Sequence, residues 1–322
     1  MIKVNSNLEM TATEMRATYC DTLISMAAEN KKLVVLDCDL SSSVGTAAFY
    51  AKYPERSFNC GVQEANAIGV SAGLSRKGFV PFVHSFAVFS SRRVCDQVFQ
   101  SCAYAGLNVK IVGCDAGISA EKNGGTHMAF EDFGVLRSIP TIMLVEPTDP
   151  VMLAALLPQI ANRYGVVYMR IPRKKVPAIY EAGSEFTLGK AALLREGTDV
   201  SIIAGGMMVS EALEAANVLA QQGVSVRVVD MFTVKPVDVD CVRECAKKTG
   251  AIVTAENHNI IGGLGSAVSE AAAENCPVPV ERVGVKDTFG DVGDVASLRQ
   301  KFGLRAEDIV ASALRVIERK KG

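Results

Sequence analysis

Glu64 is the only acidic residue in the segment NCGVQEANAIGVSAGLSRK, which spans residues 59–77. The small and apolar residues that follow it indicate a helix, with Glu64 in the first turn. Two roles suit an acid at this place. The helix dipole favours a carboxylate near the N-terminus, which is a structural role. Alternatively, a desolvated carboxyl group there shares a proton with a bound ligand.

The predicted helix also has an unusually flat face. Ala65, Gly69 and Gly73 recur every four residues and therefore lie on one side of it. Each glycine inside a helix costs about 1 kcal/mol relative to alanine. We therefore predict that another chain or segment approaches this face closely.

Aromatic, imidazole and guanidinium groups follow three further predicted strands. Phe86 and Phe89 stand three residues apart and suit either an apolar wall for a flat ring or core packing. His127 lies in the glycine-rich loop GISAEKNGGTH, where it either contacts a ligand or is a loop residue without a functional role. Arg170 and Arg173 end a strand, where they suit either bidentate anion binding or a solvated surface pair.

Two other patterns favour structural roles. Gly262-Gly-Leu-Gly265 opens a predicted helix and suits anion binding, although a tight turn is its commoner meaning. His258 follows a strand, and we assign it a structural role. The sequence contains no P-loop, no G-x-S-x-G, no H-E-x-x-H and no G-x-G-x-x-G after a strand.

Alternating strands and helices position these residues. A capping-box pattern at Thr11 and Glu14 predicts the start of the first helix. Strands are predicted at 33–39, 57–60, 79–84, 109–115, 141–145 and 166–171, with helices at 45–53, from Glu64 onward, and at 92–105, 131–138 and 149–162. The loop after 33–39 lies where open α/β sheets bind ligands.

A second alternating set follows an aperiodic segment, 174–187, which we predict to be a linker. Its strands are predicted at 199–204, 224–230, 251–256 and 279–283, and its helices at 209–222, 237–249, 264–275 and 305–320. The alternation predicts two α/β domains, residues 1–180 and 188–322, with mostly parallel sheets covered on both faces.

Composition limits the possible functions. The chain has 322 residues, a net charge of −1 and nine cysteines without a C-x-x-C pair. Balanced charge argues against nucleic-acid binding, and no apolar run reaches the roughly 18 residues that a membrane span needs. Scattered cysteines and the absence of a leader pattern predict a reducing, cytoplasmic setting. With only three histidines, histidine-rich metal chemistry is not expected.

Seven motifs stand in an order and at a spacing that resemble transketolases. They are Asp39-Leu-Ser-Ser-Ser, Gly61-Val-Gln-Glu64, Ser85-Phe-Ala-Val-Phe89, Gly125-Thr-His127, Arg137-Ser-Ile-Pro140, Glu256-Asn-His-Asn-Ile-Ile-Gly-Gly-Leu-Gly265 and Asp287-Thr-Phe-Gly290. The resemblance covers nearly the whole chain and corresponds to the C-terminal half of such enzymes: a pyrimidine-binding domain followed by a smaller C-terminal domain. It implies thiamine diphosphate as cofactor and transfer of a two-carbon ketol unit between sugar phosphates.

The resemblance also implies roles for single residues. Glu64 would hydrogen-bond the aminopyrimidine ring of the cofactor, and Phe86 and Phe89 would pack against that ring. His127 would bind hydroxyl groups of the donor sugar and act in catalysis with Glu64. Asp39 would be an acid on the cofactor side, near a subunit interface.

Ser43 and Arg170 match positions that hold the substrate's phosphate in this family. Three positions depart from the family's pattern, and the first two bear on substrate choice. Asn123 replaces the usual aspartate four residues before the histidine, Arg92 replaces a tyrosine or glycine, and Phe289-Gly-Asp-Val-Gly replaces F-G-E-S-G. We therefore expect an unusual sugar phosphate donor that contacts Asn123 and Arg92.

The family's G-D-G signature, which binds Mg²⁺ and the cofactor diphosphate, does not occur here. Magnesium on phosphates requires oxygen ligands in near-octahedral array, so we predict no metal site on this chain. The cofactor and Mg²⁺ would be held mainly by a separate N-terminal-half subunit, in an α₂β₂ heterotetramer. Alternatives are the β subunit of a 2-oxoacid dehydrogenase E1, deoxyxylulose-phosphate synthase, or a non-catalytic regulatory subunit.

Overall fold

Seven strands form the first sheet, in the order β10-β5-β6-β4-β3-β1-β2. Six of them run parallel, and β10 pairs antiparallel with β5. They are β1 (Leu33–Asp37), β2 (Ser57–Asn59), β3 (Val80–Phe86), β4 (Lys110–Cys114), β5 (Met143–Val145), β6 (Val167–Ile171) and β10 (Thr233–Lys235). The computed structural model describes residues 2–321.

Helices cover both faces of this sheet, because its central strands are buried along their whole length. They are α1 (Met15–Glu29), α2 (Ser41–Val44), α3 (Ala47–Lys52), α4 (Glu64–Arg76), α5 (Ala87–Ser91), α6 (Cys95–Gln97), α7 (Asp132–Arg137) and α8 (Pro150–Asn162). The capping box predicted at Thr11 is absent, because Thr11 Oγ1 bonds to the carbonyl of Thr13 and α1 begins at Met15.

The helix predicted at 92–105 is not one α-helix. A short 3₁₀ turn at 92–94 leads into α6, and a π-helical turn covers Val98–Tyr104. Val94, Val98 and Cys102 are fully buried at intervals of four residues. This spacing is wider than the 3.6 residues of an α-helical turn, so a wider turn keeps all three on the core.

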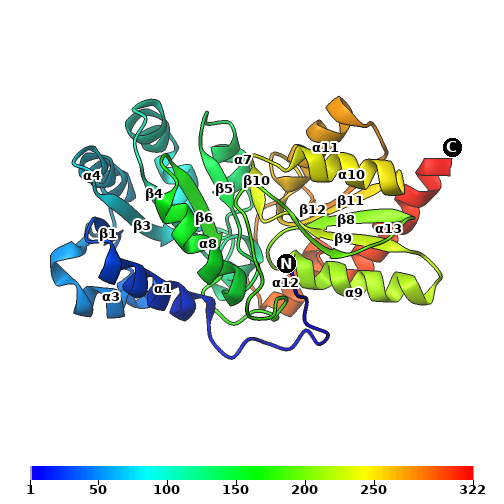
Figure 1. Ribbon diagram of the computed structural model, residues 1–322, viewed down its shortest axis with the longest axis horizontal. Coiled ribbons are helices and arrows are strands. Elements are labelled where there is room, and N and C mark those ends of the chain that lie inside the picture. Colours follow the sequence, from blue (N-terminus) through cyan, green and yellow to red (C-terminus); the bar gives the residue numbers. More distant parts are fainter. Residues whose placement is uncertain (1, 322) are drawn as a thin grey trace.

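Five strands form the second sheet, in the order β12-β11-β8-β9-β7. The strands are β7 (Ala192–Arg195), β8 (Val200–Ala204), β9 (Val226–Asp230), β11 (Ile252–Asn259) and β12 (Val280–Val285), and the helices are α9 (Met208–Gln221), α10 (Val239–Thr249), α11 (Leu264–Asn275), α12 (Val295–Phe302) and α13 (Ala306–Lys321). Figure 1 shows this sheet (yellow-green to orange strands) beside the first (blue to green strands, with β10 yellow-green). Sequence patterns did not predict β7, β10 or α12.

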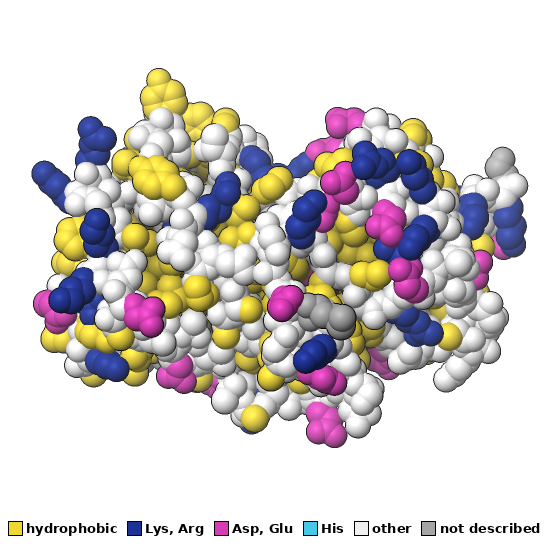
Figure 2. All heavy atoms as spheres, in the orientation of Figure 1, with side chains coloured by type: hydrophobic (Ala, Val, Ile, Leu, Met, Phe, Trp, Pro, Cys, Tyr) yellow, Lys and Arg dark blue, Asp and Glu magenta, His cyan; other side chains and the backbone are white. Residues whose placement is uncertain are grey.

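Residues 174–187 connect the two sheets, and they are packed rather than extended into solvent. Val176, Ile179 and Tyr180 are buried, and bridges join Met10 to Pro177 and Val4 to Tyr180. The N-terminal segment therefore lies against the connection between the domains. On the face drawn in Figure 2, acidic and basic side chains intermingle over the second domain. No helix within residues 2–321 is both long and apolar enough to span a membrane.

Both sheets have a topological switch point. In the first, β1 lies between β2 and β3, so the chain leaves β1 to one side and returns on the other. In the second, β8 lies between β9 and β11 in the same way. Ligands of open α/β sheets bind in the crevice at the carboxyl ends of such strands.

Candidate active site at the carboxyl edge of the first sheet

Glu64 begins α4 beside the switch point of the first sheet, and its side chain is 5% exposed. Ser85, at the end of β3, donates its hydroxyl to Glu64 Oε1 over 2.9 Å. Arg93 pairs with Oε2 at 2.7 Å and is itself 45% exposed. Both carboxylate oxygens are thus occupied, and Arg93 is the partner that an incoming ligand can displace.

Phe86 and Phe89 form a half-buried aromatic pair just after β3. Their ring centroids lie 6.4 Å apart in an edge-to-face arrangement, and the guanidinium of Arg93 lies 3.9 Å from the Phe89 centroid. The His127 ring joins this pair, at 5.2 Å from Phe89 and 6.0 Å from Phe86. The structure therefore brings Glu64, Arg93, the two phenyl rings and the imidazole into one continuous site.

Arg173 lies on the other side of Phe86, with its guanidinium 5.0 Å from the ring centroid. Asp115, which follows β4, fixes it: Oδ1 accepts the Arg173 backbone N–H over 2.9 Å, and Oδ2 pairs with Nε. Arg173 also points a terminal nitrogen at the Ser43 carbonyl, 3.5 Å away. Arg173 is therefore a cation fixed beside the aromatic wall, with Ser43 next to it.

Arg170, which the sequence resemblance assigned to the substrate's phosphate, is occupied elsewhere. Its side chain is 1% exposed, and its terminal nitrogens pair with Asp132 and Glu146 at 2.9 Å each. The guanidinium also stacks 4.0 Å from the Phe133 ring. A solvated surface position for Arg170 is therefore wrong, and both of its terminal nitrogens are engaged in ion pairs within the chain. The sequence spacing of Arg170 and Arg173 did not indicate which of the two would be buried and which would be partly exposed.

The remaining predicted residues lie around this site. Asp39 is exposed after β1, where it exchanges two hydrogen bonds of 3.0 Å with Asn59. Arg92 is 56% exposed and pairs with Glu131 at 2.8 Å, at a cavity of about 350 Å³ that Gly125 also lines. Asn123 is exposed at the end of the 3₁₀ segment that leads to the His127 loop.

Gly262-Gly-Leu-Gly265 does hold an anion, but the chain supplies it. The Glu256 carboxylate accepts the backbone N–H groups of Leu264 and Gly265 over 2.6 and 2.8 Å, at the N-terminus of α11. Burial raises the pKa of Glu256 to about 7. His258 is fully buried nearby and accepts the Gly134 backbone N–H, and burial lowers its pKa to about 4. Both side chains thus bond backbone groups of the chain itself.

The groups around Glu64 fit one side of a flat heteroaromatic cofactor. The phenyl pair offers stacking surface, and the carboxylate at its base can bond a ring nitrogen. The cavity beside Glu64 within this chain measures only about 10 Å³, the size of one water molecule. Among residues 2–321, no group of three or more His, Cys, Asp or Glu side chains is placed to hold a metal ion.

Comparison with known families decides the family. Residues 11–178 match the transketolase pyrimidine binding domain, and residues 189–309 match the transketolase C-terminal domain. The chain belongs to the transketolase family. It corresponds to the C-terminal half, because it carries these two domains and is 34% identical to "Transketolase-like protein 2" of Mus musculus over 94% of this chain but only 48% of that one.

Several relatives of similar length are split transketolases. The chain is 53% identical to a "6-deoxy-6-sulfo-D-fructose transketolase subunit SqwH" of a Clostridium species, over 95% of both chains. It is 37% identical to one subunit of an apulose-4-phosphate transketolase from Phocaeicola vulgatus, over 94% of this chain and 97% of that one. A "split gene transketolase, inactive beta4 tetramer" superposes with a TM-score of 0.88 at 41% identity, over 96% of this chain and all of that one.

Proposed function

We propose that this chain is the C-terminal subunit of a two-chain transketolase whose preferred donor is a six-carbon ketose with a sulfonate at C6. The observation that carries the proposal is the open half-site: Glu64, Phe86, Phe89 and His127 form one wall, with about 10 Å³ of cavity beside the carboxylate. A separate N-terminal-half subunit supplies the opposite wall, in an α₂β₂ assembly. Nine free cysteines fit a reducing, cytoplasmic location.

Thiamine diphosphate, held with Mg²⁺ mainly by the partner, supplies the electron sink for cleavage of the C2–C3 bond of the donor. This chain's residues do the rest. Glu64 holds a proton at the pyrimidine ring nitrogen, and Phe86 and Phe89 fix the ring plane and exclude water. His127 hydrogen-bonds the donor's hydroxyl groups.

The anionic end of the donor is bound by Arg173, with Ser43 beside it. A guanidinium binds sulfonate and phosphate oxygens alike, because both present several acceptors in a plane. At Asn123 a neutral amide replaces the carboxylate usual in the family, which removes a repulsion toward any anionic donor, sulfonate or phosphate. The two relatives quoted above act, by their names, on donors other than the ordinary pentose phosphates.

The donor assay uses the chain reconstituted with its N-terminal-half subunit, thiamine diphosphate and Mg²⁺. Transfer of C1 and C2 from a six-carbon 6-sulfonated ketose to an aldose phosphate must leave a four-carbon aldose that keeps the sulfonate at C4. We expect mass spectrometry to detect this product, and kcat/KM to be higher for the sulfonated ketose than for fructose 6-phosphate. A preference for the phosphate would refute the donor assignment and leave the transketolase activity standing.

Glu64→Ala tests catalysis within the same assembly. We expect kcat to fall by roughly 10²–10⁴-fold, the usual cost of removing a proton-transfer group. Unchanged turnover would show that the subunit only supports a site elsewhere. Release of CO₂ from a 2-oxoacid, without ketol transfer, would instead identify an E1-type enzyme.

A further inference from the structure

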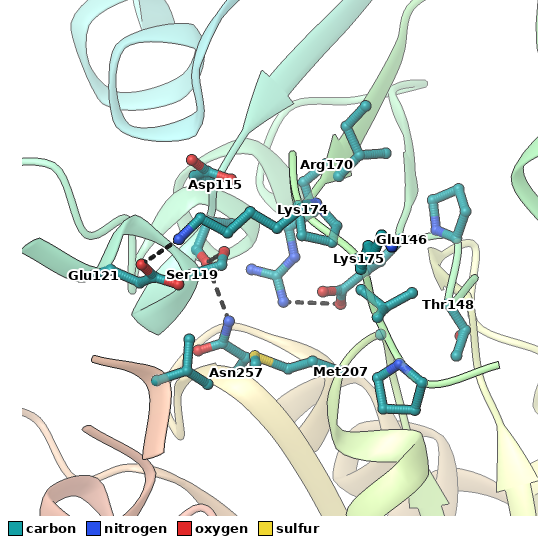
Figure 3. Close-up of a pocket in the computed structure, with 18 of the residues that line it drawn as sticks. Asp115, Ser119, Glu121, Glu146, Thr148, Arg170, Lys174, Lys175, Met207 and Asn257 are labelled. Atoms are coloured by element: carbon teal, nitrogen blue, oxygen red, sulfur yellow. Dashed lines mark hydrogen bonds and ion pairs between the residues drawn. The ribbon is translucent and has the colours of Figure 1, made fainter. Parts of the chain in front are cut away.

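A second cavity, of about 420 Å³, lies between the two domains, and neither Glu64, Phe86, Phe89 nor His127 lines it. Its walls come from the carboxyl ends of β6 and β11, from the segments after β4, β5, β6 and β8, and from Met10 and α12. Figure 3 shows the guanidinium of Arg170 in the middle of this space, between Ser119 and Glu146. A volume of this size is that of a small-molecule site.

The cavity also lies at the switch point of the second sheet. Gly206 and Met207 follow β8, and Asn257 lies near the end of β11, the neighbour on the side opposite β9. Gly206 has φ +53° and lies against the Glu146 carboxylate, so the chain turns sharply to open the crevice. Asn257 closes the floor by bonding the Ile118 N–H and the Ala116 carbonyl, each over 3.0 Å. This is the place where an open α/β sheet binds its ligand.

The lining is mainly apolar with a small surplus of positive charge. Met10, Pro147, Val176, Met207 and Val295 contribute much of the apolar surface. The acidic wall residues are each matched by a cation: Lys174 pairs with Glu121 at 2.6 Å, Arg170 with Glu146 at 2.9 Å, and Arg173 with Asp115.

One positive charge and one unpaired N–H donor remain available at the walls. Lys175 lines the cavity and is exposed, and its ammonium makes no ion pair or hydrogen bond with the described residues. Arg170, fully buried, has an Nε–H without an acceptor among residues 2–321. Buried polar groups in folded proteins almost always have a partner. The cavity therefore has an apolar interior, and an anion inside it could pair with the Lys175 ammonium and accept the Arg170 Nε–H.

We propose that this interdomain cavity is a second binding site, which takes a small organic anion with an apolar body. The body lies against Met10, Pro147 and Met207, and the anionic group faces Lys175. The site is placed to modulate the active site, since Asp115 forms part of its wall and its carboxylate holds Arg173 beside Phe86. This proposal does not depend on the donor assigned above.

The test uses 8-anilinonaphthalene-1-sulfonate, an aromatic anion whose fluorescence rises on transfer into apolar surroundings. The native full-length chain contains no tryptophan, so its background emission is low. We expect saturable binding of one probe per chain. Lys175→Glu should weaken it by roughly fivefold or more, because an attractive charge becomes repulsive. Met207→Trp should abolish it by filling the cavity.

Matched controls separate this site from general apolar binding. Lys247→Glu makes the same charge change at an exposed residue of α10, and Leu314→Trp adds the same ring at a position on α13 that is 40% exposed. Neither should alter probe binding, and near-ultraviolet circular dichroism should show that all four variants are folded. Equal probe binding by Lys175→Glu and Lys247→Glu would overturn the proposal. So would displacement of the probe by thiamine diphosphate in the reconstituted assembly, which would place the probe at Glu64.

Discussion

Two arginines three residues apart, Arg170 and Arg173, lie in opposite surroundings. Arg170 is enclosed by Asp132, Glu146 and the Phe133 ring, so its charge is neutralised within the chain. Arg173 is one-fifth exposed and held by Asp115 at the edge of the aromatic wall. The burial of each arginine therefore separates their roles: the buried Arg170 neutralises carboxylates, and the partly exposed Arg173 can contact a ligand. The two side chains predict different losses on substitution.

Arg173→Met should weaken donor binding. We expect the KM for an anionic donor to rise by roughly 10- to 100-fold, the value of one or two hydrogen bonds to a charged group. The KM should change much less for a donor without an anionic end. The free energy of unfolding should also fall, because the buried Asp115 carboxylate loses its cation. Steady-state kinetics with both donors checks this, and an equal rise for both would assign the anion to another residue.

Arg170→Met should act on stability instead. It leaves the Asp132 and Glu146 carboxylates buried without their cation, a loss of about 3–5 kcal/mol for a buried pair. Urea unfolding of the chain measures this loss against Arg173→Met, which leaves one buried carboxylate without its cation rather than two. If Arg170→Met and the wild type unfold at the same urea concentration, the expected loss is contradicted. The Asp132 and Glu146 carboxyl groups would then be protonated or solvated in the folded variant.

At the scale of elements, α4 combines two functions on two faces. Glu64, Ile68 and Ala72 face the sheet, whereas Ala65, Gly69 and Gly73 are exposed. A Cβ atom added at Gly69 or Gly73 would meet nothing within 4 Å in this chain. The flat face is therefore not explained by packing within the chain, and an interface with another chain remains our prediction for it.

Substitutions at Gly69 test that interface. Gly69→Ala should raise the free energy of unfolding of the isolated chain by up to about 1 kcal/mol, since alanine favours the helix. Gly69→Leu should leave the isolated chain folded but reduce its association with the N-terminal-half subunit or with its own copies. Ala273→Leu, at an exposed position of α11, is the control. Analytical ultracentrifugation reads out the assembly, and unaltered assembly of Gly69→Leu would exclude this face.

The type of most elements could be predicted from the sequence. Buried parallel strands appear as runs of apolar residues, and helices show apolar residues three or four positions apart. The misses have physical reasons. β7 and β10 are short edge strands whose three or four residues show no period, and β10 pairs with a sheet far away in sequence. The motifs named Glu64, Phe86, Phe89 and His127, whose rings and carboxylate the structure brings together. Contacts between residues distant in sequence could not be predicted. Examples are the ion pair of Arg93 with Glu64 and the bonding of Glu256 to the turn at Gly262–Gly265.

On the scale of the whole molecule, buried carboxyl groups join the domains. Asp230, on β9, accepts the hydroxyls of Thr148 and Tyr180 from the other domain over 2.5 and 2.7 Å. Burial raises the pKa of Asp230 to about 7, as it does that of Glu256. Folding therefore requires each carboxyl either to bind a proton or to hold a charge away from water.

These carboxyl groups make stability depend on pH. Each has a folded-state pKa near 7 and an unfolded value near 4, so the folded state binds more protons between those values, and the contribution to the free energy of unfolding falls as pH rises from about 4 to 7. His258, with its pKa lowered by burial, acts in the opposite direction over part of this range. We therefore expect the difference in unfolding free energy, Glu256→Gln minus wild type, to become more positive with rising pH. Urea titrations at pH 5 and pH 8 measure it, and a pH-independent difference would contradict the raised pKa.

The antiparallel pairing of β10 with β5 has a consequence for biosynthesis. Residues 233–235 leave the ribosome long after the other six strands of the first sheet, and until then β5 presents an open edge. Unpaired edges recruit strands from other chains, and N-terminal domains fold first during synthesis. During synthesis the first domain is therefore prone to aggregation through the β5 edge until the β10 residues of the second domain have emerged. A chain cut at residue 188 should stay in that state permanently and aggregate.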